Sequence, residues 1–566
     1  MSASEISRVP VSPRTCSRAA VWALLVCACA TLLAPLFVVD IPPLLDYPNH
    51  LARAWAIAGL SSNALLSSMF RTHWEAIPNL ATDLLLPPLI GPFSVHVAGR
   101  MMLGVILVLP VLGCVAYARM LFGRMTVWSV ASALVATHGL FLLGFMNFSF
   151  SVGLALLSAA AWGTLRPRMP LAAAAAGTCL SVALFFSHLM GVVFFAVLAG
   201  CREIESRTGP GARPQSVPRK LAGAAVAMAP ILVPAVLLFE LTRLGSLDLA
   251  IGWTLPLDKL RQLALPVVNY DPLLDAVTMI AILGMFGAAL LARRVRMPLS
   301  TCLALATLSA IYLVLPFALK GTSFLDSRLP VMIGFLVFAG FSPRPLPTQF
   351  GRLAVLALGS LLLVRTVNVM WVWQSHESDL RDLREVIAQV EPGSNVLLAS
   401  VSPDEAPAEW AAERPSRLLS NGQRIDQHIA ALLLIERQAA WPFFFADPAQ
   451  QPLSFTGRFA EAARLTPQMP NYTDIVTAFA DPQHPTGKAA ALVTCPLCFD
   501  YLLLLEAGYR PNFPGLPQAR LRLVAANGFA ALFQTRPSPL IATTPQAGEP
   551  REALVGIEPA TGRGLP

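Results

Sequence analysis

The residues best suited to chemistry lie together in the segment 45–53, which reads LDYPNHLAR. Asp46 offers a carboxylate, His50 an imidazole and Arg53 a guanidinium, all within about two helical turns. Pro48 suits the first turn of a helix, because its φ is already helical and its missing N–H needs no partner there. His50 and Arg53 then recur at helical spacing. We therefore expect a short amphipathic helix with Asp46 at its entrance and His50 and Arg53 facing the water.

A purely structural interpretation of these side chains is also open. An aspartate directly before a helix can cap the first amides and complement the positive end of the helix dipole. Asp46 would then have no role in chemistry. Arg53 has a similar alternative, because a long basic side chain near a membrane can simply extend its charged end to water.

The elements that must position these residues are membrane-spanning helices. Hydrophobic residues make up 55% of the chain and charged residues 13%, with a mean hydropathy of +0.61, whereas soluble domains carry about 25% charge. Apolar runs such as 21–39, 101–118, 222–239 and 353–364 approach the ~20 residues that a bilayer span needs. The chain is therefore predicted to be an all-α polytopic membrane protein. Arginines in short inner loops explain its net charge of +8, so no nucleic-acid partner is expected.

Positive charge orients the chain in the bilayer. Arg8, Arg14 and Arg18 precede the first apolar run and place the N-terminus in the cytoplasm. That run continues to Val39 without the break that signal-peptide cleavage normally follows, so we expect a retained first span. The later runs predict about eleven transmembrane passages. The resulting map has a cytoplasmic segment 1–18, a transmembrane domain 19–373 with outer loops 40–83, 240–272 and 320–328, an extracytoplasmic domain 374–536 and a disordered tail 537–566.

The apolar run 171–200 can be interpreted in two ways. One helix would leave the basic residues that follow it outside, against the positive-inside tendency. A turn near Ser187-His188 would make two short passes and keep those residues inside. We favour the hairpin, although each half is shorter than an ordinary span.

The extracytoplasmic domain is predicted to be α/β. Segments 379–390 and 426–438 have helical patterns, 395–401 and 501–505 resemble buried strands, and 521–534 resembles a strand pair around the turn dipeptide Asn527-Gly528. Cys495 and Cys498 lie in this domain, where an oxidising compartment favours a local disulfide. Free thiols and thioredoxin-like redox chemistry are the alternatives.

Further polar residues gather at the outer ends of the predicted spans, where ionisable groups are expensive and often functional. Asp83 could instead complement a helix dipole, and His138 and His188 could be core histidines bonded to a neighbouring carbonyl. His73 and Glu75 could ligate a metal, but two ligands without partners are a weak signal. The candidates for a substrate cavity are Tyr47, Asn49, His73, Glu75, Asp83, His138, Asn147, His188 and Asp326.

An acidic residue just behind a first span, surface helices in the first outer loop, many later spans and an outer C-terminal domain form a recognisable arrangement. It resembles the GT-C superfamily of membrane glycosyltransferases, which take sugars from polyprenyl-phosphate carriers. The segment FSHLMG at 186–191 lies where many bacterial relatives have a polar break between two short helices. The resemblance extends to about residue 373 and does not include the C-terminal domain.

The resemblance implies a role for each outer residue. Asp46 would be the general base that deprotonates an acceptor hydroxyl, and His50 would orient or assist it. Arg328 and Lys320 would bind the carrier phosphate, with Arg53 as a further candidate. No second acid pairs obviously with Asp46, although Asp326 could serve, so a requirement for a divalent cation such as Mg²⁺ or Mn²⁺ stays open.

The function expected from this resemblance is inverting transfer of a hexosyl or pentosyl group from a lipid-linked donor to a lipid, glycan or protein acceptor. The protein would lie in a bacterial inner membrane with its C-terminal domain in the periplasm. A membrane transporter is the main alternative, but transporters commonly have repeated halves and midplane charges. A non-catalytic envelope assembly factor is the third possibility.

Overall fold

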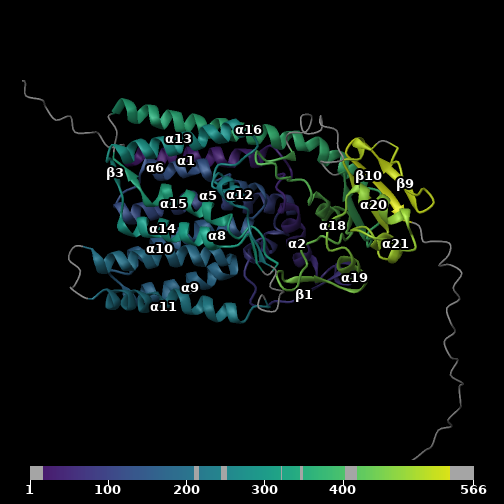
Figure 1. The fold of residues 1–566 in the computed structure, drawn as a ribbon, viewed down its shortest axis with the longest axis horizontal. Helices are drawn as coiled ribbons and strands as arrows, with labels where there is room; N and C mark the ends of the chain where they lie inside the picture. The colour runs from purple at the N-terminus through teal and green to yellow at the C-terminus, as the bar shows by residue number, and fades with distance from the viewer. Residues whose placement is uncertain are drawn as a thin grey trace, which may run out of the picture.

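A computed structural model describes residues 17–209, 216–243, 251–319, 321–344, 348–401, 417–510 and 512–535. It shows a bundle of long helices with a smaller domain of helices and strands at one end (Figure 1). The predicted mainly helical fold with a small C-terminal sheet domain is therefore confirmed. The predicted tail 537–566 and nearly all of the segment 1–18 lie outside the described residues.

Seven helices in the described residues are long and apolar enough to cross a membrane. They are α1 (Arg18–Leu33, extended by the 3-10 turn η1, Ala34–Phe37), α5 (Val95–Phe122), α8 (Met146–Leu165), α9 (Pro170–Ser187), α11 (Val217–Glu240), α13 (Pro272–Leu291) and α16 (Thr348–Ile387). Shorter or more polar helices complete the bundle: α6 (Val127–Val130), η3 (Ala131–Val135), α7 (Gly139–Leu142), α10 (Leu189–Thr208), α14 (Leu299–Val314) and α15 (Arg328–Gly340).

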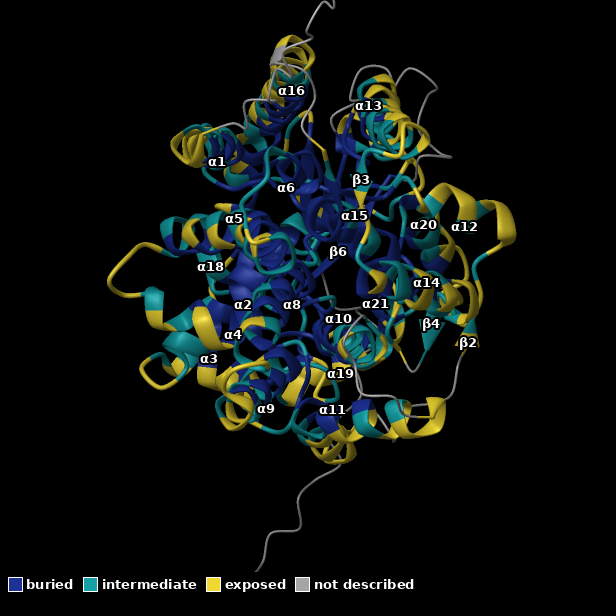
Figure 2. Cartoon of the chain, turned by 90° about the vertical axis from the view of Figure 1, so that its left-hand side faces the viewer, coloured by how far each residue is buried: buried dark blue, intermediate teal, exposed yellow. Residues whose placement is uncertain are grey.

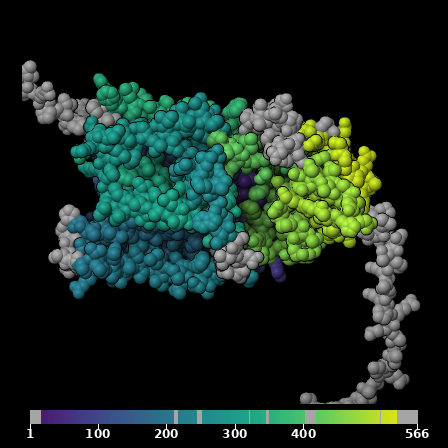
Figure 3. All heavy atoms as spheres, in the orientation of Figure 1, coloured from purple at the N-terminus to yellow at the C-terminus, as the bar shows by residue number. Residues whose placement is uncertain are grey.

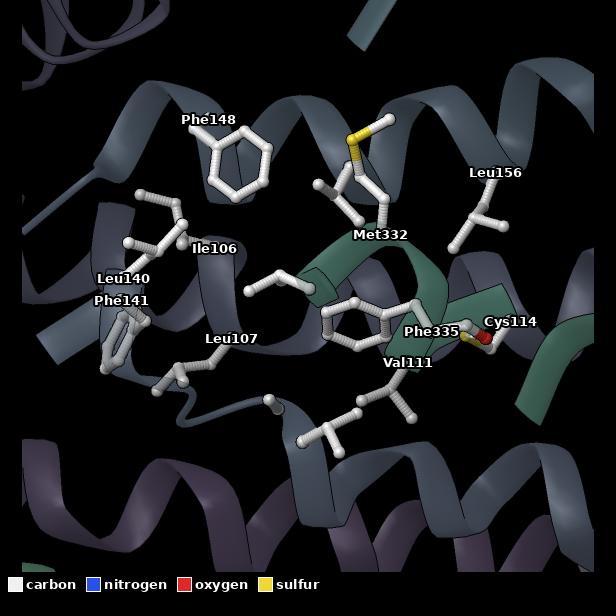
Figure 4. Close-up of a cluster of buried hydrophobic side chains, with 14 of the residues drawn as sticks. Ile106, Leu107, Val111, Cys114, Leu140, Phe141, Phe148, Leu156, Met332 and Phe335 are labelled. Carbon is white, nitrogen blue, oxygen red and sulfur yellow. Dashed lines mark hydrogen bonds between the residues drawn. The ribbon is translucent and has the colours of Figure 1, made fainter. Parts of the chain in front are cut away.

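The centre of the bundle is formed by α5, α8, α10 and α15, which are mostly buried, whereas α1, α11, α13 and α16 at the rim expose apolar faces (Figure 2). Helices α5 and α8 approach closely because Gly153 has no side chain: a Cβ there would lie 2.6 Å from the backbone of Leu109. Figure 4 shows the core that results, with Phe148 of α8 and Phe335 of α15 beside apolar residues of α5.

Two expectations about helix boundaries can be compared with the structure. The predicted turn at Ser187-His188 is confirmed, because α9 ends and α10 begins there and the two helices pack together. The helix expected separately at 379–390 is instead the end of α16, a single helix of 40 residues and about 60 Å. The expected domain boundary at residue 374 therefore falls inside α16, because no helix-breaking residue separates the span from the amphipathic segment.

The C-terminal domain contains a four-stranded sheet in the order β6-β8-β10-β9. Strand β6 runs parallel to β8, and the other two pairs are antiparallel. The hairpin predicted around Asn527-Gly528 joins β9 and β10, and Cys495 and Cys498 form a disulfide. The strands are β6 (Val396–Ser400), β7 (Leu453–Phe455), β8 (Tyr501–Leu505), β9 (Leu521–Ala526) and β10 (Ala530–Thr535), and the helices are η6 (Ile429–Ala431), α18 (Leu432–Arg437), α19 (Gly457–Leu465), α20 (Tyr472–Ala480), α21 (Ala491–Thr494) and η7 (Ala507–Tyr509).

The predicted first outer loop, residues 40–83, folds onto this domain. Strand β1 (Phe70–Thr72) pairs antiparallel with β7, and residues of α2 (Tyr47–Gly59) and α3 (Ala64–Met69) share an apolar core with β6 and β8. Helix α4 (Ala81–Leu85) begins at the end of this loop, and η2 (Pro87–Leu89) follows it. In the predicted second outer loop, β2 (Ile251–Gly252) precedes α12 (Pro256–Gln262) and pairs with β4 (Ala318–Leu319), which ends directly before the predicted third outer loop. A further pair, β3 (Val295–Arg296) with β5 (Ser342–Pro343), lies at the opposite end of the bundle (Figure 1).

Candidate active site

Asp46 lies at the start of α2, and its backbone is held by the turn that follows α7. The Asp46 amide donates to the Leu143 carbonyl at 3.2 Å. Gly144 has a φ of +78°, and a Cβ there would lie 2.6 Å from the Asp46 nitrogen, so a side chain at this position would displace Asp46. The Asp46 carboxylate makes no capping hydrogen bond to α2. The side chain of Asp46 is therefore not a helix cap.

The carboxylate of Asp46 instead faces His428 of the C-terminal domain. His428 Nδ1 donates to Asp46 Oδ1 at 2.8 Å. The His428 side chain is 24% exposed and the Asp46 side chain 15%. A group approaching from solvent can thus reach both. Nothing in the sequence pointed to His428, because it lies 382 residues from Asp46 and no local pattern joins them.

The prediction that His50 and Arg53 face water is wrong, since both side chains are buried. Arg53 forms a two-pronged ion pair with Asp83, from Nε to Oδ1 at 2.5 Å and from Nη2 to Oδ2 at 2.9 Å. The reason is tertiary: η6 and α18 of the C-terminal domain pack on α2 and cover its polar face. Arg53 is already neutralised by Asp83, so we do not assign it to the carrier phosphate.

His50 is neutral in this environment. Its pKa is lowered well below the usual value by burial, and further by the positive charge of Arg53 and by His428. Its Nδ1 accepts hydrogen bonds from Arg53 Nη2 and from the Thr82 hydroxyl, both at 3.2 Å. His50 thus helps to fix the Arg53–Asp83 pair and lies beside Asp46 without contacting its carboxylate in any hydrogen bond of the described residues.

Arg328 differs from the other buried arginines of the described residues. Arg53, Arg365, Arg417 and Arg424 each form an ion pair with a carboxylate. Arg328 is only 6% exposed, donates from Nη1 to the Ser323 carbonyl at 3.0 Å, and has no ion pair among the described residues. Its Nε is buried without a hydrogen-bond partner there. Asp46 and Asp326 lie close enough for their charges to act on it.

Aromatic rings and helix ends surround the Arg328 guanidinium. It lies over the rings of Phe145 and Phe148, at 5.3 and 6.0 Å from their centroids, and His188 meets the Phe148 ring edge-on at 5.6 Å. Helices α8, α10 and α15 all begin here, at Met146, directly after His188 and at Arg328. Three positive helix ends and one guanidinium favour an anion at this point.

Asp326 is already engaged by the second outer loop. It accepts from the Thr254 hydroxyl at 2.6 Å and lies 3.9 Å from Lys259 Nζ, a cation that sequence analysis did not identify. Lys320, the other predicted phosphate ligand, lies outside the described residues.

Three other predicted residues are engaged in structural contacts. His138 is buried, caps α7 by accepting from the Phe141 amide at 3.0 Å, and therefore behaves as a core histidine. Asn147 joins α8 to the first outer loop, because it accepts from the Thr82 amide and donates to the Asn79 carbonyl. His188 likewise caps α10, accepting from an amide rather than donating to the expected carbonyl.

The remaining predicted residues divide into two pairs. His73 donates to the Pro448 carbonyl at 3.1 Å, and Glu75 forms an ion pair with Arg243, so each is occupied by a different partner. Tyr47 and Asn49 are fully buried next to Asp46, and the Tyr47 hydroxyl and both Asn49 amide atoms have no hydrogen-bond partner among the described residues.

A divalent cation finds no evident ligand set in this arrangement. In the described part of the chain, no three His, Cys, Asp or Glu side chains group as metal ligands. Asp326, the predicted second acid, is bonded to Thr254 and faces Lys259, and no contact joins it to Asp46.

The site opens to solvent between the two parts of the molecule. Figure 3 shows a hollow between the helical bundle and the C-terminal domain, with purple atoms of the N-terminal part of the chain on its floor. In the same orientation, α2 lies at this position (Figure 1). The partial exposure of Asp46 and His428 agrees with an opening here.

No protein-family model and no curated protein matches the sequence. Among solved structures, the chain is similar to the crystal structure of ArnT from Cupriavidus metallidurans bound to undecaprenyl phosphate. The two share 13% sequence identity with a TM-score of 0.48, over 92% of this chain and 98% of ArnT.

Proposed function

We propose that this chain is a membrane glycosyltransferase that moves a sugar from a polyprenyl-phosphate carrier to an extracytoplasmic acceptor, with inversion at the anomeric carbon. The observation that carries the proposal is Arg328, a buried guanidinium without an ion pair among the described residues. A buried charge is strongly unfavourable unless it is paired. A lipid-borne phosphate would supply the missing negative charge beside the first residues of the apolar helices α8 and α15.

The proposed chemistry uses the negative charge of Asp46 and the positive charge of Arg328. Asp46 takes the proton of the acceptor hydroxyl, and the acceptor oxygen attacks the anomeric carbon as the bond to the phosphate oxygen breaks. The polyprenyl phosphate leaves with the bonding electrons, and Arg328 stabilises its charge, since a guanidinium can hold two phosphate oxygens at once. No acid is needed to protonate this leaving group, unlike in glycoside hydrolysis.

The setting of the reaction belongs to the same proposal. The sequence resemblance to GT-C enzymes and the positive-inside pattern favour a bacterial inner membrane, with Asp46, Arg328 and the C-terminal domain on the periplasmic side. The acceptor would be a lipid, glycan or protein of the envelope, and the sugar a hexose or a pentose.

The proposal is tested with the full-length protein in membranes that receive radiolabelled polyprenyl-phosphate hexose and pentose donors. We expect label transfer by wild type, a loss of about 10²- to 10⁴-fold in Asp46→Asn, and a raised donor KM in Arg328→Met. Arg261→Met is the matched control, because Arg261 is an exposed arginine of the second outer loop paired with Asp258.

Each outcome has a distinct meaning. Equal transfer by Asp46→Asn and wild type would exclude Asp46 as the base. No transfer by wild type with any donor would remove the glycosyltransferase proposal and favour a transporter or an assembly factor.

A further inference from the structure

The C-terminal domain delivers one titratable side chain to the site. His428 lies directly before η6, and its Nδ1 is 2.8 Å from Asp46 Oδ1. An ionised carboxylate only accepts hydrogen bonds, so His428 must carry a proton on Nδ1 and donate it. Because no capping bond ties Asp46 to α2, this bond sets the direction of its carboxylate.

Aromatic residues of the same domain fix the imidazole ring. Trp441 and Phe445 meet His428 edge-on, with ring centroids 6.0 and 5.6 Å away. Phe445 also meets His50 edge-on at 5.6 Å and lies 5.8 Å from the Arg53 guanidinium. The ring of His428 is therefore held by two aromatic side chains, and Phe445 contacts His50 and Arg53 as well.

Buried ion pairs anchor the backbone that leads to His428. Arg417 donates to Asp379 of α16 and to Glu506 after β8, at 2.8 and 2.6 Å. Arg424 pairs with Asp426 at 2.7 Å and with Glu506 at 2.8 Å. Burial, followed by the charge of Asp426, raises the pKa of Glu506, whereas Arg424 lowers that of Asp426.

The same segment is tied to the helical bundle. The Ser420 hydroxyl donates to Asp275 of α13 at 2.6 Å, and the Ser420 amide donates to the Asn269 carbonyl at 2.8 Å. Asp275 is paired in turn with Arg365 of α16. Residues 417–428 are thus fixed to both parts of the molecule, and the position of His428 relative to Asp46 is determined before any substrate arrives.

We propose that His428 is a positioning residue for Asp46, so that the C-terminal domain completes the active site. Its Nδ1–H holds the carboxylate in one direction, toward the hollow where the acceptor hydroxyl binds. This role rests on the proposed function, because it presumes that Asp46 is the base. The groups facing His428 are Asp46, His50 and Arg53 of α2, with Asp426 two residues earlier on its own segment.

Three substitutions of His428 separate positioning from other roles. Asn places its amide nitrogen where Nδ1 lies, Gln places it near Nε2, and Ala removes both. We expect His428→Gln and His428→Ala to lower kcat about 10- to 100-fold with little change in acceptor KM, the effect of one charge-assisted hydrogen bond. His428→Asn should stay within about threefold of wild type.

Two results would overturn the proposal. If His428→Asn is as impaired as His428→Ala, the imidazole Nε2 acts directly and the role is not positioning. If all three variants match wild type, Asp46 needs no partner. His484→Gln is the matched control, because His484 is an exposed histidine of the same domain that faces Asp481.

A second measurement does not depend on activity. In protein with ¹⁵N-labelled histidine, reconstituted in lipid, His428→Asn assigns the His428 signal, and Asp46→Asn should shift that signal while leaving His484 unchanged. A shift without any sugar transfer would keep the contact and reject only the proposed function. No shift would reject the contact itself.

Discussion

At the scale of single residues, the described arginines show two ways to bury a positive charge. Arg53 has a permanent partner in Asp83, and both side chains are 1% exposed. Arg328 is nearly as buried but has no carboxylate ion pair in the described residues. Because Arg53 already has a carboxylate partner, we expect it to stabilise the fold. Arg328 lacks such a partner in the described residues, so we expect its role to depend on a bound anion.

The Arg53–Asp83 pair can be tested by stability. Arg53→Met leaves Asp83 buried and unpaired and should lower the free energy of unfolding by about 3–5 kcal/mol. The double variant Arg53→Met with Asp83→Leu removes both charges and should recover most of the loss. Thermal unfolding of the purified proteins measures the difference. A double variant less stable than the single one would show that the pair contributes more than mutual neutralisation.

At the scale of elements, the turn after α7 positions the start of α2. Gly144 allows this contact because it has a positive φ and presents no side chain to the Asp46 backbone. Both of these properties belong to Gly144 and not to α2. The position of the proposed base is therefore set by an element about a hundred residues away.

Gly144→Ala should reduce activity by displacing Asp46. A misplacement near 1 Å can lower a rate about 10²-fold, so we expect a loss of that order in the sugar-transfer assay. Gly123→Ala is the control, because Gly123 has a similar φ of +70° but no neighbour within 4 Å of a Cβ. Equal losses in both variants would assign the effect to backbone strain and not to Asp46.

At the scale of the whole molecule, the bundle and the C-terminal domain form one connected structure. Helix α16 continues from one into the other, β1 of the first outer loop pairs with β7, and Ser420 binds Asp275. The candidate site lies between the two parts, where His428 of the C-terminal domain reaches Asp46. The proposed chemistry consequently requires the C-terminal domain and the outer loops on the same side of the membrane.

Labelling of single cysteines tests this arrangement in intact cells. In a variant that keeps only the Cys495–Cys498 disulfide, Lys488→Cys lies on the C-terminal domain and Arg168→Cys lies between α8 and α9; both positions are exposed. A membrane-impermeant maleimide should modify Lys488→Cys directly and Arg168→Cys only after permeabilisation. The reverse pattern would place the proposed site in the cytoplasm.

The sequence alone identified the membrane class, the turn at Ser187-His188, the strand at 501–505 and the hairpin at Asn527-Gly528. These features depend on hydropathy and on backbone preferences of neighbouring residues, which are local properties. It also selected Asp46 and Arg328, although Asp46 could equally have been a helix cap.

Only the tertiary structure decided which charges meet. Asp83 neutralises Arg53, Lys259 faces Asp326, and His428 reaches Asp46 from the far end of the chain. Such pairs join elements that are far apart in the sequence and that meet only when their apolar faces pack. A single sequence therefore predicts which side chains are available, whereas packing determines which of them are paired, which are covered and which stay open to a substrate.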